Sequence, residues 1–177
     1  MIKSFVVHNF QCFRQSVSVS LECLSQDSQK SQIFTSPSGL VLSKAMVFVG
    51  ANASGKTTLL KAVAFVYWFI KHSFHLRPKD VIPLAPHFSS SQHPSSFELE
   101  FEFKGKLWRY RLLATKNRVE HESLAFQQGK DFTFVFSRQW DGENECYAFT
   151  QRQFGLMEKA AESIRSNASV ISTAVQF

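Results

Sequence analysis

The sequence predicts an α/β fold in which mixed or antiparallel β-sheets surround a buried helix. Two runs, 97–103 and 106–113, alternate strictly between apolar and polar residues, as the strands of a hairpin do. A third stretch, 44–72, reads as a short apolar strand, a loop with glycine at both ends and an apolar helix. With 177 residues and 44% hydrophobic residues, the chain is long enough to bury a substantial core.

The first 43 residues predict two strands and a loop. Residues 2–10 and 16–24 read as strands, and the alternation is clearest in SVSVSLECL. Residues 25–39 are polar and rich in Ser and Gln, so they are expected to form a loop.

The central segment predicts a strand and a helix that are both buried. The run KAMVFVG, 44–50, is expected to be a strand covered on both faces. A helix is expected from about Lys56 to His72. Because it has almost no polar side, it should be covered all round. Its apolar residues are Leu59, Leu60, Val63, Phe65, Val66, Tyr67, Trp68, Phe69 and Ile70.

Residues 77–96 hold four of the five prolines and a run of serines, so they are expected to be a long irregular loop. The hairpin that follows has a predictable register. Apolar residues should pair on one face, and glutamates should face arginines on the other, which favours a solvated sheet face over a metal site. The predicted pairs are Phe103–Lys106, Phe101–Trp108, Leu99–Tyr110, Phe97–Leu112, Glu100–Arg109 and Glu98–Arg111.

The last third predicts one more strand pair and a helix. DFTFVFSRQW and ECYAF flank DGEN, which is a good turn sequence. From about Arg152 the pattern becomes helical, and the final stretch SVISTAVQF shows no capping or terminating residue.

Composition excludes several classes of protein. The three cysteines, Cys12, Cys23 and Cys146, show neither a disulfide framework nor zinc-ligand spacing. The N-terminus lacks a signal peptide, and the most apolar run, 59–70, is too short to cross a bilayer. A cytoplasmic protein without a membrane partner is expected. The net charge of +6 suits a phosphate-bearing ligand or nucleic acid.

Residues 50–57 match G-x-x-x-x-G-K-[ST], the pattern of a phosphate-binding loop. Gly50 and Gly55 allow backbone conformations that turn successive N–H groups toward phosphate oxygens. The following helix adds the positive end of its dipole, and Lys56 adds a charge for the β- and γ-phosphates. The Thr57 hydroxyl is a candidate Mg²⁺ ligand, and Thr58 can donate to the α-phosphate. The pattern therefore predicts a bound nucleotide, and no Asn-Lys-x-Asp motif points to guanine.

Three stretches of the sequence carry a family resemblance. VGANASGKTTLLKAV, the opening MIKSFVVHNFQCFRQSVSVSL and the later NRVEHESLAF, with Glu122 two residues before Leu124, together resemble the RecF/SMC-like branch of ABC ATPases. The likeness is strongest to the OLD-like and abortive-infection ATPases. It covers residues 1–125 well and 126–177 loosely.

The resemblance implies an ABC-type N-terminal lobe that uses ATP and Mg²⁺, with Lys56 as the catalytic residue and Thr57 as the metal ligand. It also implies that the turn after Asn9-Phe10 approaches the nucleotide from the side. The family places Lys or Arg, often followed by Ser, after that pair, whereas this chain has Gln11-Cys12 and then Arg14, so Gln11 and Arg14 both stay candidates. The candidate ATP-binding residues are Gly50, Asn52, Ala53, Ser54, Gly55, Lys56, Thr57 and Thr58.

Two elements of an ABC-type site are missing from the sequence. No aspartate follows four apolar residues and precedes a glutamate, as a Walker B strand requires; the aspartates are Asp27, Asp80, Asp131 and Asp141. The nearest Ser/Gly cluster to such a signature segment, 36–39, reads as a turn and lies before the loop. Residues 1–177 are therefore expected to be an N-terminal lobe that binds ATP without efficient hydrolysis.

By resemblance, the leading functional hypothesis is an anti-phage defence ATPase that controls a partner nuclease or toxin through nucleotide-driven dimerisation. In the full-length protein the ATPase domain would form a homodimer or a higher oligomer. A DNA-repair or DNA-clamp ATPase of the same fold stays open as an alternative, and so does a non-catalytic nucleotide-sensing regulatory subunit. Steeply salt-dependent DNA binding would favour the DNA-directed alternative.

Overall fold

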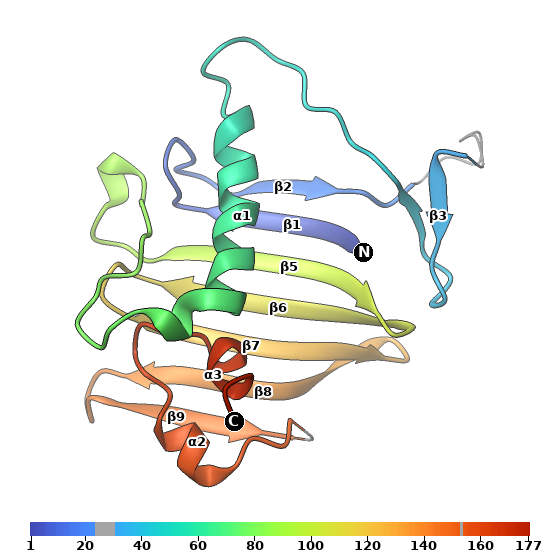
Figure 1. Ribbon diagram of the computed structural model, residues 1–177. Coiled ribbons are helices and arrows are strands. Elements are labelled where there is room, and N and C mark those ends of the chain that lie inside the picture. The colour runs from blue at the N-terminus through green and yellow to red at the C-terminus, as the bar shows by residue number, and fades with distance from the viewer. Residues whose placement is uncertain (24–30, 153) are drawn as a thin grey trace.

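Seven antiparallel strands form the main sheet of the computed structural model, which describes residues 1–23, 31–152 and 154–177. The order across the sheet is β2-β1-β5-β6-β7-β8-β9 (Figure 1). The mixed α/β architecture with a mainly antiparallel sheet is therefore confirmed. The strands are β1 (Ile2–His8), β2 (Val17–Ser20), β5 (Ser95–Phe103), β6 (Lys106–Ala114), β7 (Val119–Gln128), β8 (Asp131–Asp141) and β9 (Cys146–Gln151).

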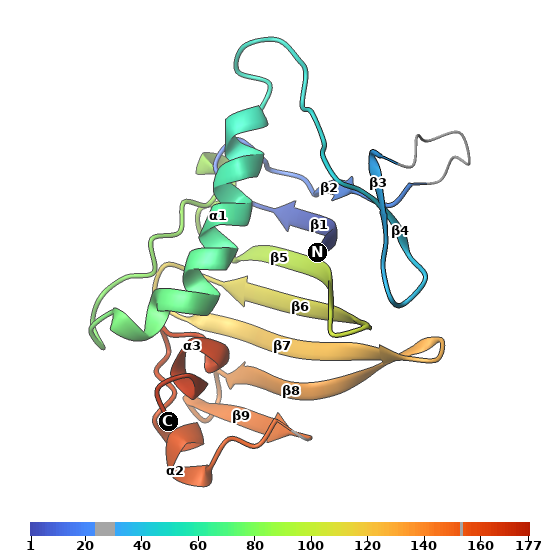
Figure 2. The same cartoon turned by 45° about the vertical axis from the view of Figure 1, so that its right-hand side comes forward.

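A separate two-stranded hairpin, β3 (Ile33–Thr35) and β4 (Val41–Ser43), lies beside the N-terminal edge of the main sheet (Figure 2). The expectation that 25–39 is a loop is wrong for β3, while residues 24–30 lie outside the described part. Strands of three residues are too short to show alternation, and the turn between them is held by the Ser36 hydroxyl, which accepts from the Leu40 amide.

The predicted hairpin is confirmed pair by pair, since β5 and β6 adopt the expected register from Phe97↔Leu112 to Phe103↔Lys106. On the polar face, the Glu100 carboxylate lies 2.6 Å from the Arg109 guanidinium and 3.1 Å from Lys3 Nζ. Burial raises the pKa of Glu100, but the hydrogen bonds and charges of Arg109 and Lys3 together outweigh it, so the pKa lies below the ordinary value of 4.5.

This lowered pKa makes the protein acid-sensitive in a predictable direction. The stabilisation is fully present above the unfolded-state pKa and is lost as the pH falls through the lower folded-state pKa. We expect Glu100→Gln to lose less unfolding free energy than the wild type between about pH 7 and about pH 3, measured by urea titration. Glu143→Gln, an exposed control, should follow the wild type. Parallel losses in wild type and Glu100→Gln would contradict the prediction.

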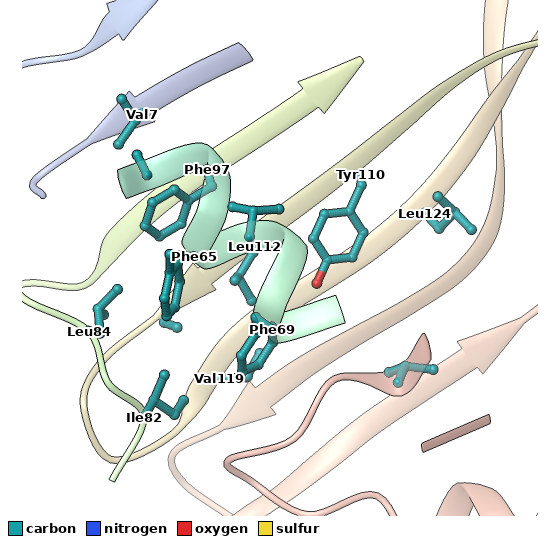
Figure 3. Packing of buried hydrophobic residues seen from close by; sticks show 14 of the residues in the cluster. Val7, Phe65, Phe69, Ile82, Leu84, Phe97, Tyr110, Leu112, Val119 and Leu124 are labelled. Atoms are coloured by element: carbon teal, nitrogen blue, oxygen red, sulfur yellow. The ribbon is translucent and has the colours of Figure 1, made fainter. Parts of the chain in front are cut away.

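The helix α1 (Lys56–His72) crosses one face of the sheet and supplies much of the core. Its buried positions recur every three or four residues, as expected for one helix face, and are Thr58, Leu59, Ala62, Phe65, Val66 and Phe69. The Phe65 ring lies 5.1 Å from Phe97 of β5, and Phe69 points toward Val119 of β7 (Figure 3). The predicted bounds of this helix match those observed.

The expectation that this helix is covered on all sides is wrong. Leu60 and Tyr67 are 59% and 61% exposed, and they lie on the side away from the sheet. A single sheet covers only one helix face, and in the described residues no second layer covers the other.

The expected buried strand at 44–50 is also wrong. No residue from Lys44 to Gly50 is in a strand, and Val47 and Val49 are 82% and 90% exposed. Figure 2 shows this connection arching from β4 to the start of α1, away from the main sheet. A strand needs a neighbour to pair with, and the described part of the chain places none alongside it.

The C-terminal segment is less helical than the sequence predicts. The strand pair β8–β9 around residues 142–145 is confirmed. The helix expected from about Arg152 is reduced to α2 (Glu158–Glu162), since Gly155 has φ 78°, which a helix cannot accommodate. A second short helix, α3 (Val170–Ala174), has an N-cap, because the Ser169 hydroxyl accepts from the Ile171 amide. The expectation of no capping residue is therefore wrong.

A buried ion pair joins the sheet to α3. Glu122 of β7 and Arg138 of β8 are 0% and 1% exposed and lie 2.8 Å apart. The Glu122 carboxylate also accepts from the Tyr110 hydroxyl, the Ser169 hydroxyl and the Val170 amide. Burial, together with the Glu122 charge, raises the pKa of Tyr110 well above its ordinary value.

Candidate nucleotide-binding site

The loop between the arching connection and α1 closes around one ammonium group. Lys56 Nζ donates to the carbonyl oxygens of Gly50 at 2.8 Å and Ala51 at 2.7 Å, and lies 3.3 Å from Ser54 Oγ. Ala53 and Gly55 have φ 64° and 91°. Two left-handed residues in such a short loop bend the backbone tightly, as an anion-binding concavity requires.

The first turn of α1 opens into a depression beside this loop, and most of the residues that line it are polar. Its lining includes the side chain of Cys12 and residues 52–58. No acidic residue lies in the first turn of the helix, so the N-terminal N–H groups and dipole act there without competition. Thr57 is exposed at the mouth, while Thr58 is buried and its hydroxyl accepts from Cys12 Sγ at 3.1 Å. The depression can therefore hold a phosphate chain and present a hydroxyl to a cation.

The turn after β1 braces the loop from one side. A Cβ atom built on Gly55 would lie 2.6 Å from the Phe13 ring and 3.3 Å from Cys12 Sγ. Glycine is therefore required at position 55 for two reasons. Other residues are strained at its positive φ, and the Phe13 ring leaves no room for a Cβ atom.

Asn9 fixes the other end of the same turn. It is fully buried, with φ 53°. Its amide nitrogen donates to the carbonyls of Ser90, His93 and Pro94, and its side-chain oxygen accepts from the His87 amide. The turn 9–13 thus lies between the irregular segment 77–94 and the loop 50–55.

A second depression, on the other side of the loop, is mainly apolar. Phe13, Val17, Val19, Phe48 and Val49 line it, together with Gly50, residues 54–56 and Leu59. Neither depression has a carboxylate in its described lining. Within these two linings, therefore, no carboxylate is placed to activate a water molecule.

The structure brings the predicted residues Asn52, Ala53, Ser54, Gly55, Lys56, Thr57 and Thr58 together in one depression, and it places Gly50 across the loop. Gln11 and Arg14 are not in the lining of either depression. Cys12, which lies between them in the sequence, does line the depression at the start of α1, although sequence reasoning did not select it. Glu122 lies elsewhere, buried against the N-terminus of α3.

In the described residues, no group of three or more His, Cys, Asp or Glu side chains is arranged to hold a metal ion. Nor does any described helix have the length and hydropathy needed to cross a bilayer.

Comparison with known proteins identifies the family. The family model described as "AAA domain, putative AbiEii toxin, Type IV TA system" matches residues 45–169, which is well over half of the chain. No curated protein matches the sequence. The loop, the depression at the helix N-terminus and this match agree, and the chain belongs to this family of AAA-domain P-loop ATPases.

Proposed function

We propose that the chain binds Mg²⁺-ATP in the loop 50–58 and is the N-terminal lobe of a RecF/SMC/OLD-like ATPase. The observation that carries this proposal is the geometry of Lys56, whose ammonium is held at the mouth of an acid-free helix N-terminus by carbonyls of the loop itself. A phosphate would replace those carbonyls as its partner. The exposed Thr57 hydroxyl would be the protein's ligand to Mg²⁺, whose charge offsets that of the phosphates.

The lobe should hold ATP without turning it over efficiently. Hydrolysis needs a positioned water and a group that polarises it, and no carboxylate is in the described lining of either depression. The exposed apolar run 46–49 suggests that a further strand is missing from this lobe, because its exposed valine side chains favour pairing in a sheet. We propose that this strand, and the catalytic carboxylate, come from the second half of the ATPase.

Calorimetric titration with ATP and Mg²⁺ tests the proposal. Lys56→Ala should weaken ATP binding by about 10- to 100-fold, as expected for loss of a charge-assisted contact. Lys61→Ala, on the exposed side of the same helix, is the matched control and should bind as the wild type does. Equal affinities for wild type and Lys56→Ala would refute the site, and Lys56-dependent ATP turnover by this chain would refute the lack of hydrolysis.

The biological role is proposed from the family. Its description as a putative toxin of a type IV toxin–antitoxin system is consistent with an ATPase that acts in anti-phage defence. There, nucleotide-driven dimerisation would control a partner nuclease or toxin. A DNA-repair or DNA-clamp ATPase is the second candidate, and the net charge of +6 is the observation that favours it.

A further inference from the structure

A third depression, also polar, lies at the end of the molecule where the irregular segment meets the turn between β6 and β7. Leu84 and Pro86 contribute apolar surface to it. The polar lining is formed largely by Ser91, Gln92, His93, Lys116 and Asn117. Both of the chain segments that form it lie on the same side of the molecule, to the left of α1 in Figure 1.

The charge in this depression is positive and uncompensated. Lys116 is exposed, and its ammonium makes no ion pair with any carboxylate in the described part of the chain. The one carboxylate in the lining, Glu120, is already 2.9 Å from the Arg118 guanidinium. That guanidinium in turn stacks on Trp140 at 4.8 Å. An anion entering the depression would therefore meet a free ammonium and no free acid.

An exposed aromatic ring belongs to the same chain segment as half of this lining, between Pro86 and Ser91. Phe88 is 86% exposed and lies three residues before Ser91 in the chain. Its backbone is fixed, because it begins the 3₁₀ turn η2 (Phe88–Ser90) and the Asn9 amide binds residues on both sides of it. The His87 ring packs against it with centroids 4.4 Å apart. An exposed ring on a rigid backbone loses little conformational entropy when it stacks on a ligand.

We propose that this surface binds single-stranded nucleic acid, with a backbone phosphate in the depression at Lys116 and His93 and an unpaired base on Phe88. Cationic grooves combined with aromatic platforms are the recurring solution for single strands, since every base has a face that can stack. In a duplex the bases are already stacked, so Phe88 would have no partner there. The proposal does not depend on ATP binding in the loop 50–58.

Fluorescence anisotropy with labelled oligothymidylate of about 20 nucleotides, at about 50 mM salt, tests the proposal. Phe88→Ala should weaken binding by about 5- to 150-fold, the range expected for one stacked base. Lys116→Ala should weaken it and reduce the slope of log affinity against log salt by about 0.7, the loss of one phosphate contact.

Matched controls exist at the far end of the sheet (Figure 1). Phe103 is 53% exposed at the end of β5, and Lys130 is exposed in the turn after β7. Phe103→Ala and Lys130→Ala should bind oligothymidylate as the wild type does. Lys56→Ala should do so as well, which separates this site from the proposed ATP site. Phe88→Trp should retain binding, which distinguishes stacking from a fold defect.

Three outcomes would overturn the proposal. One is an equal effect of Phe88→Ala and Phe103→Ala. Another is duplex DNA that binds as tightly as the single strand with the same dependence on Phe88. The third is an acidic peptide such as polyglutamate that binds with the same dependence on Phe88 and Lys116, because the surface would then recognise protein.

Discussion

Glu122→Ala is expected to lower the free energy of unfolding by about 3–5 kcal/mol, the usual cost of removing one partner from a buried ion pair. In this variant the Arg138 guanidinium stays buried, at 1% exposure, without the Glu122 carboxylate. Among the described residues, no other carboxylate pairs with it. The carbonyls of Arg165 and Ala168 still accept from Arg138, but they carry no compensating charge. Urea titration measures the loss.

Three other groups lose an acceptor in the same variant, which is why the effect should be large. The Tyr110 and Ser169 hydroxyls and the Val170 amide all donate to the Glu122 carboxylate. The last two begin α3, so the contact between α3 and the sheet should loosen with them. Increased hydrogen exchange confined first to 165–174 would show this directly.

The control for Glu122→Ala lies two residues earlier on the same strand. Glu120 pairs with Arg118 at 2.9 Å, but these side chains are 20% and 42% exposed. Glu120→Ala should therefore cost no more than about 1 kcal/mol, as surface pairs do. Similar losses for the two alanine variants would show that the buried network does not hold the sheet and α3 together.

The parts of the fold that were predictable from sequence are those set by local pattern. The register of β5 on β6 follows from a strict alternation and a two-residue turn, since a shift by one residue would turn every phenylalanine to the charged face. The bounds of α1 follow in the same way from the loop glycine at one end and the change of pattern at the other. Both depend on residues close together in the chain.

The predictions that failed concern what covers a segment. Apolar residues at 44–50 and around the whole of α1 show that these segments favour burial, but the pattern does not say which chain segment provides the cover. In the described structure Val49 and Tyr67 remain exposed. The proposed second half of the ATPase would explain both failures at once.

The candidate site also has a part that could be predicted from local sequence and a part that could not. The phosphate-binding pattern identifies the loop residues because their roles come from the backbone of eight consecutive residues. Cys12 and Phe13 contact the loop only through tertiary packing, across more than forty residues of sequence. Periodicity and spacing carry no information on such a contact, and only the family resemblance pointed to the turn after Asn9-Phe10.

Gly55→Ala tests that tertiary contact, and it is expected to lower the free energy of unfolding by about 2–5 kcal/mol. At φ 91° the backbone of any residue with a Cβ atom is strained, which lowers the free energy of unfolding by about 1–2 kcal/mol. The new methyl group would also lie 2.6 Å from the Phe13 ring, and such overpacking costs about 1–3 kcal/mol. Because Gly55 precedes the first residue of α1, ATP binding should weaken as well. Urea titration and calorimetry measure the two effects separately.

Two further variants separate backbone strain from steric clash. Gly39 has φ 85° and no atom within 4 Å of a built Cβ, so Gly39→Ala should show the strain alone, about 1–2 kcal/mol. Adding Phe13→Ala to Gly55→Ala removes the clash but keeps the strain, so the double variant should be more stable than the two single losses predict by addition. If the losses simply add, Phe13 does not brace the loop. A non-additive result would show that Phe13, in the turn after β1, packs against the loop 50–55 in solution, a contact that lies outside the sequence motif.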